Sequence, residues 1–148
     1  MSHLVELAPL KGPVVVTAAY FCLWYYLLLG LQRGVKYKLR DEYAARGEAF
    51  DRYFGQDPRM LAVDRVVINT QEQMVPFLVS MWMHALLVSP THATVLGLAY
   101  VALRGLYPAL LGTRVSKLQS RRVVVATIPC YLIVVYLLGS TVFAALAG

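Results

Sequence analysis

Three polar side chains, spaced as on one face of a helix, stand at the start of an apolar stretch that continues to Val88. They are Arg65, Asn69 and Glu72. At about 100° per residue, positions i, i+4 and i+7 fall within roughly 60° of one another. Ionisable side chains at membrane depth are costly and normally face a partner, a cavity or a ligand. We therefore expect a functional site on this face.

The next apolar stretch repeats this spacing with Tyr100, Arg104 and Tyr107. Pro108 lacks the N–H that would bond the carbonyl of Arg104, and Pro76 has the same effect on Glu72. Irregular backbone at membrane depth usually lines protein or water. Two such stripes on neighbouring helices predict a pocket between them.

The elements that carry these stripes are expected to cross a membrane. The chain of 148 residues is 59% hydrophobic and only 15% charged, which is too apolar for an ordinary soluble domain of this length. A spanning helix needs about 20 residues. We predict an all-α, integral membrane four-helix bundle, one domain over 1–148, with a loop over 32–64. The expected spans are about 13–31, 65–88, 92–112 and 122–147.

The basic residues predict the orientation of this bundle. Eight Lys and Arg residues lie in 33–65 and four in 114–122, whereas 89–92 and the C-terminal end have none. The positive-inside rule then makes both basic segments cytoplasmic and puts both termini on the non-cytoplasmic side. The net charge of +6 thus needs no nucleic acid, and no histidine has a metal-spaced partner. Within the first loop we expect an interfacial helix over 41–54 and a new helix from Pro58 or Arg59.

The two ordered motifs resemble the MAPEG family, membrane-associated proteins in eicosanoid and glutathione metabolism. They are Arg65-x3-Asn69-x2-Glu72 followed by Pro76-Phe77-Leu78, and Tyr100-x3-Arg104-x2-Tyr107. The resemblance implies a homotrimer in the lipid bilayer with glutathione, the co-substrate, bound between adjacent subunits near the cytoplasmic face. It also implies a transferase or peroxidase reaction with a lipophilic small molecule as the electrophile.

Carried over by residue, the resemblance implies that Arg65, Asn69, Glu72 and Tyr107 contact glutathione. Arg33 matches a basic family position, and Tyr100 and Arg104 belong to the helix-three motif. The family's eicosanoid branch has Tyr where this chain has Gln73 and Leu111, and its thiolate-activating Arg corresponds to Leu118. The nearby cations Arg114 and Arg121 are the candidates for that catalytic role.

Structural readings of the same residues remain open. Arg65 could anchor the helix at the headgroups, with Asn69 and Glu72 joining helices. Arg104 and Tyr100 could form a hydrogen-bonded pair without a ligand. The departures from the family pattern also leave a non-catalytic, lipid-binding scaffold of the same fold as the alternative function.

Overall fold

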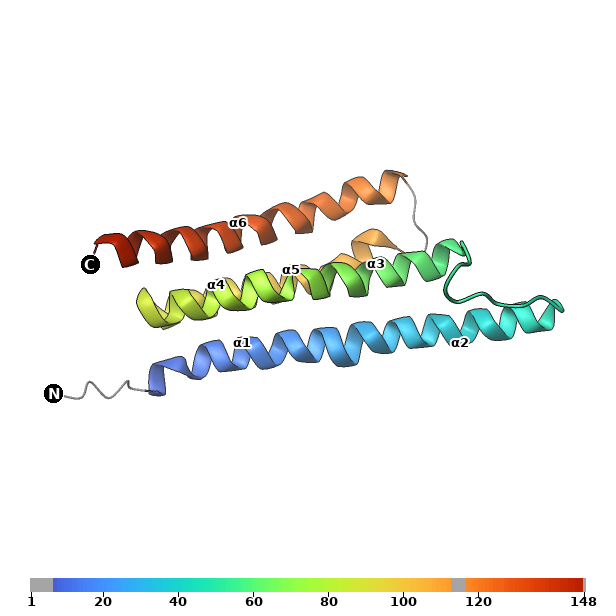
Figure 1. Ribbon diagram of the computed structural model, residues 1–148, viewed down its shortest axis with the longest axis horizontal. Coiled ribbons are helices and arrows are strands. Elements are labelled where there is room, and N and C mark those ends of the chain that lie inside the picture. The colour runs from blue at the N-terminus through green and yellow to red at the C-terminus, as the bar shows by residue number, and fades with distance from the viewer. Residues whose placement is uncertain (1–6, 113–116, 148) are drawn as a thin grey trace.

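The computed structural model describes residues 7–112 and 117–147, with the side chains of 117–121 left out. All regular structure in these residues is helical, and the helices run side by side along the long axis of the molecule (Figure 1). In chain order they are the 3-10 helix η1 (Ala8–Leu10), α1 (Lys11–Phe21), the π-helix η2 (Cys22–Leu28), α2 (Leu29–Ala45), α3 (Pro58–Glu72), α4 (Met74–Leu87), α5 (Pro90–Leu111) and α6 (Lys117–Ala147).

The first four elements follow one another as a single rod over Ala8–Ala45. The prediction of a loop from residue 32 is therefore wrong for residues 32–45, which are helical. This part of α2 contains no proline and packs Leu39, 1% exposed, against Met60 and Val63 of α3. Those tertiary contacts extend the helix beyond its apolar stretch.

The connection over 46–57 is irregular, so the predicted interfacial helix over 41–54 is wrong for residues 46–54, while 41–45 are helical as the end of α2. Gly47 has a φ of 72°, a left-handed conformation that ends the preceding helix. The carboxylate of Asp51 then accepts hydrogen bonds from the backbone N–H groups of Tyr53 and Phe54 at 3.0 and 2.9 Å. A turn stabilised by an aspartate side chain therefore replaces the expected helical backbone.

The start of α3 at Pro58 confirms the predicted helix start. Asp57 caps this helix, because its carboxylate accepts the backbone N–H of Arg59 at 2.9 Å. The Arg59 guanidinium also donates to Asp57 and to Glu42 of α2, at 3.0 and 2.6 Å. This guanidinium holds the pKa of Asp57 below its usual range. The cap thus ties the start of α3 to the end of α2.

A break at Gln73 separates α3 from α4, which continues in the same direction (Figure 1). The break lies three residues before Pro76, whose missing N–H leaves the Glu72 carbonyl without its helical partner. Three described helices are long and apolar enough to cross a membrane: Ala8–Ala45, Pro90–Leu111 and Arg122–Ala147. The predicted second span is thus divided between α3 and α4, while the arrangement of four rods is retained.

Aromatic side chains from three rods form the centre of the bundle. The ring of Tyr100 on α5 stacks on Phe77 of α4, with centroids 3.8 Å apart. Tyr20 of α1 contacts both rings and donates its hydroxyl hydrogen bond to the Thr70 carbonyl at 2.5 Å. Close packing reaches Gly97, where an added Cβ would lie 2.7 Å from Val16 Cγ1. The core therefore fixes α5 against both α1 and α4.

The outer faces of the rods are apolar instead of charged. On α6, Val125, Leu132 and Val135 are 62–70% exposed. A water-soluble surface of this size would expose charges along such a helix. Together with the three long apolar helices, this exterior indicates an integral membrane protein. The sidedness of the termini and the homotrimer stay predictions.

Candidate functional site

An open cavity of about 260 Å³ brings together four of the side chains singled out in the sequence. Arg65, Asn69 and Glu72 reach it from α3, and Tyr107 reaches it from α5. The remaining lining residues are the apolar Ile68, Leu111 and Val123. Both predicted stripes thus contribute to one pocket, although only one residue of the second stripe does so.

The amphipathic pattern of α3 directs its polar stripe to this cavity. Its opposite face is buried: Val66 and Val67 pack in a cluster that also contains Tyr107. Since side chains one or two positions apart point in different directions on a helix, Arg65 and Ile68 are left outward. Glu72 is the last residue of α3, so the proline-induced break places its carboxylate where one helix ends and the next begins.

Charge at the site is accessible and uncompensated within the described part of the chain. Arg65 and Glu72 are exposed, Asn69 is half-buried, and Tyr107 is 6% exposed. No salt bridge among the described residues involves Arg65 or Glu72. The cavity therefore offers a cation, an anion and neutral hydrogen-bonding groups against an apolar wall, which suits a ligand that carries charges of both signs.

Tyr100 and Arg104 are buried inside the bundle and do not line the cavity. They are 0% and 1% exposed, and Arg104 Nε donates to the Tyr100 hydroxyl at 3.4 Å. The same guanidinium lies 5.7 Å from the centroid of the Tyr107 ring. Within the described residues its Nη1 and Nη2 atoms have no hydrogen-bond partner. The bond from Nε is the Arg104–Tyr100 pair of the structural reading, and the ligand role of both residues stays a prediction.

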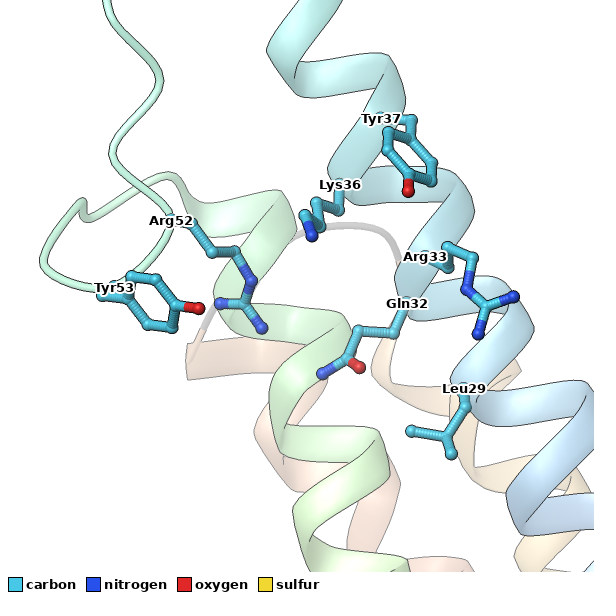
Figure 2. A pocket seen from close by; sticks show the side chains of 7 residues that line it. All are labelled: Leu29, Gln32, Arg33, Lys36, Tyr37, Arg52 and Tyr53. Atoms are coloured by element: carbon cyan, nitrogen blue, oxygen red, sulfur yellow. The ribbon is translucent and has the colours of Figure 1, made fainter.

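The other predicted site residues are not placed in the cavity. Arg33 lines a separate cavity of about 290 Å³ between α2 and the 46–57 connection (Figure 2). Arg114 and the side chain of Arg121 lie outside the described residues, so their catalytic role stays a prediction. Within the described chain, no group of three or more metal-ligating side chains comes together.

Sequence reasoning missed Ile68 and Val123 in the lining, and it named Leu111 only as a departure from the family pattern. Ile68 follows Arg65 by three residues and Leu111 follows Tyr107 by four, so helical spacing could have identified both. Val123 could not have been found in this way, because its approach depends on how α6 packs against α5. It also missed Asp64, whose carboxylate accepts hydrogen bonds from Gln32 and Arg52 across separations of 32 and 12 residues.

The comparison with protein-family models matches residues 12–143 to the model described as the MAPEG family. No curated protein matches the chain. The matched region includes most of each of the four rods and every residue that lines the candidate cavity. On this match over most of its length, the chain belongs to the MAPEG family.

Proposed function

We propose that this protein is a membrane-bound, glutathione-dependent transferase or peroxidase that acts on a lipophilic electrophile. The observation that carries the proposal is the convergence of Arg65, Asn69, Glu72 and Tyr107 on one cavity. Membership of the MAPEG family supports a glutathione-related or lipid-related activity in a membrane.

The charges of glutathione match those of the cavity. Glutathione has two carboxylates and one ammonium group at neutral pH. The guanidinium of Arg65 offers a forked pair of donors to a carboxylate, and Glu72 accepts from the ammonium. Asn69 and the Tyr107 hydroxyl supply neutral partners for the peptide groups. Opposite charges from one helix would then fix the orientation of the tripeptide.

A neighbouring subunit would complete this site. The cavity leaves Arg65 and Glu72 exposed, and its volume of about 260 Å³ is below the range of about 300–1,000 Å³ for most ligand sites, so a further surface would be needed to enclose a tripeptide. Arg33 belongs to a different cavity of the same subunit, so its contact with glutathione would have to come from a second copy. We therefore propose the homotrimer, with glutathione between adjacent subunits near the cytoplasmic face.

The reaction would begin with ionisation of the glutathione thiol, whose proton leaves to solvent. The thiolate sulfur then forms a bond to an electrophilic carbon that arrives from the bilayer, while the bond from that carbon to its leaving group breaks and the leaving group departs with the electron pair. In the peroxidase form, two glutathione molecules reduce a lipid hydroperoxide to an alcohol and water and become the disulfide. A cation lowers the pKa of a thiol by favouring the thiolate, and Arg114 and Arg121 are the proposed sources.

The apolar wall of the cavity favours one other candidate function, a non-catalytic lipid-binding scaffold. Ile68, Leu111 and Val123 offer no hydrogen bond to a peptide, and Leu111 stands where the eicosanoid branch has a tyrosine. In that case an acyl chain would occupy the cavity, and Arg65 would bind a headgroup.

Isothermal titration of the detergent-solubilised protein with glutathione tests the two candidates. Under the enzyme proposal glutathione binds, and its complex conjugates a model electrophile such as 1-chloro-2,4-dinitrobenzene faster than free glutathione does. The absence of both heat and conjugation would overturn the enzyme proposal. Saturable binding of a fatty acid by the same preparation would then support the scaffold.

A further inference from the structure

A second, cationic cavity lies between α2 and the 46–57 connection (Figure 2). Its lining residues are Leu29, Gln32, Arg33, Lys36, Tyr37, Arg52 and Tyr53. Lys36 extends from α2 and Arg52 from the connection into the space between them, while Arg33 lies on the other side of α2 in this view. Basic side chains from two separate segments therefore meet at one hollow.

The hollow is held in shape by a partly buried carboxylate on α3. Arg52 Nη1 and Nη2 donate to the two carboxylate oxygens of Asp64, each at 2.9 Å, and Gln32 Nε2 donates to Oδ1 at 2.7 Å. The Asp64 side chain is only 19% exposed. This forked pair fixes Arg52 above α2 and leaves other N–H groups of its guanidinium available to a ligand.

Positive charge in this cavity exceeds negative charge. Asp64 compensates Arg52, whereas Arg33 and Lys36 form no salt bridge with any described residue. Because Arg33 lies on the other side of α2, about one uncompensated positive charge, that of Lys36, remains in the hollow beside the donors of Arg52. A phosphate group supplies the negative charge and the acceptor oxygens that these two side chains can bind.

The face of the helix below the cavity is apolar and continuous with it. Leu29 lines the cavity, and Tyr25 and Tyr26 lie in the π-helix η2 immediately before it. These tyrosines are 59% and 73% exposed. Cations at one end and an exposed apolar face below them fit an amphiphile with a phosphate head.

We propose that this cavity binds the phosphate headgroup of an anionic phospholipid whose acyl chains lie along the Tyr25–Leu29 face. Lys36 and Arg52 are the contacts of the phosphate, and Arg33, on the other side of α2, is not one of them. Basic pockets beside membrane helices bind such headgroups, and each basic residue near an anionic surface contributes about 1 kcal/mol, equivalent to about a fivefold change in affinity. The bound lipid would anchor the 46–57 connection against the membrane.

Native mass spectrometry of the full-length protein in detergent tests this proposal, with phosphatidic acid and phosphatidylcholine added separately. We expect phosphatidic acid to bind at least about fivefold more tightly, since the uncompensated Lys36 acts on its phosphate. Lys36→Gln should weaken phosphatidic acid binding about fivefold. The matched control is Lys38→Gln, which removes the same charge from the same helix outside this cavity and should leave binding unchanged.

Arg52→Gln is a second variant, and thermal unfolding reports whether loss of its pair with Asp64 disturbs the fold. If Arg52→Gln is unstable, the comparison of Lys36→Gln with Lys38→Gln still tests the proposal. Equal binding of the two lipids, or equal losses in Lys36→Gln and Lys38→Gln, would overturn the proposal. Displacement of the lipid by inorganic phosphate or glutathione at matched ionic strength would also overturn it, in favour of a soluble anion. The glutathione affinity of Lys36→Gln, expected to be unchanged, is a separate test of the proposed enzyme.

Discussion

Removing either charge of the candidate glutathione site should weaken glutathione binding by a measurable and specific amount. We consider Arg65→Ala and Glu72→Ala, which remove opposite charges from the same face of α3. Both side chains are exposed in the subunit and form no salt bridge with described residues. Their loss should therefore leave α3 folded, because its packing depends on the opposite, buried face.

The size of the effect follows from the kind of contact. A hydrogen bond to a charged group contributes about 1.5–3 kcal/mol, and solvent access to the cavity reduces this value. We expect a loss of about 1–3 kcal/mol for each variant, which corresponds to a rise of about 5- to 150-fold in the dissociation constant. The lower part of this range applies if no neighbouring subunit covers the site.

Isothermal titration with two ligands assigns the partner of each charge. Glutathione is compared with its deaminated analogue, which lacks the ammonium group. If Glu72 accepts from the ammonium, the analogue binds weakly to the parent, and Glu72→Ala causes almost no further loss. Arg65→Ala should weaken both ligands equally. The matched controls Arg40→Ala and Glu48→Ala remove exposed charges of the same type outside the cavity.

Unchanged glutathione affinity in both Arg65→Ala and Glu72→Ala, with the oligomer intact, would refute this reasoning. Arg65 would then be an anchor at the headgroups. Equal losses in the controls would show instead that binding follows net charge, without a specific site. A loss for Glu72→Ala that is just as large with the deaminated analogue would refute the assignment of the ammonium.

Three further outcomes are expected. Native mass spectrometry should show a homotrimer, and a preparation of monomers and dimers would contradict the shared site. Ultraviolet titration of the glutathione complex should show the thiolate below pH 8, and at least one of three alanine variants should show less thiolate than the parent. If the parent showed no thiolate near neutral pH, activation by a cation would be contradicted. Those variants are Arg114→Ala, Lys117→Ala and Arg121→Ala. Asp57→Ala should cost about 1–2 kcal/mol of stability in thermal unfolding, through loss of the α3 cap. Because the pKa of Asp57 is lowered in the fold, this difference should be present at neutral pH and disappear as the pH falls through the lowered pKa; a difference that persists in acid would contradict the ionic origin.

Hydropathy and helical periodicity were sufficient to predict the four rods and the convergence of α3 and Tyr107. They were insufficient for the end of the first rod. Residues 32–45 are polar enough to resemble a loop, and only the packing of Leu39 against Met60 and Val63 shows why they stay helical. Pro76 predicts that the helix breaks nearby, but the residue at which it breaks cannot be read from the sequence.

Local sequence patterns could not predict the long-range polar contacts. Nothing in the spacing of Gln32, Arg52 and Asp64 indicates that they meet, because their contact depends on the path of the 46–57 connection. The same contact gives the cationic cavity its shape. Arg33 was predicted from the family motif alone, and its position in that cavity could be known only after the connection had been placed.

The two polar stripes have the same spacing but different surroundings, and this difference explains why only one of them forms most of the site. Spacing at i, i+4 and i+7 indicates that three side chains point in the same direction, but it does not indicate what they contact there. Because α5 packs against α1, α3, α4 and α6, its stripe turns toward the interior, and Arg104 is buried with Tyr100. Because α3 packs mainly against the first rod and α5, its stripe faces outward. Tyr107, at the last turn of α5, is the point where the inner stripe reaches the outer one.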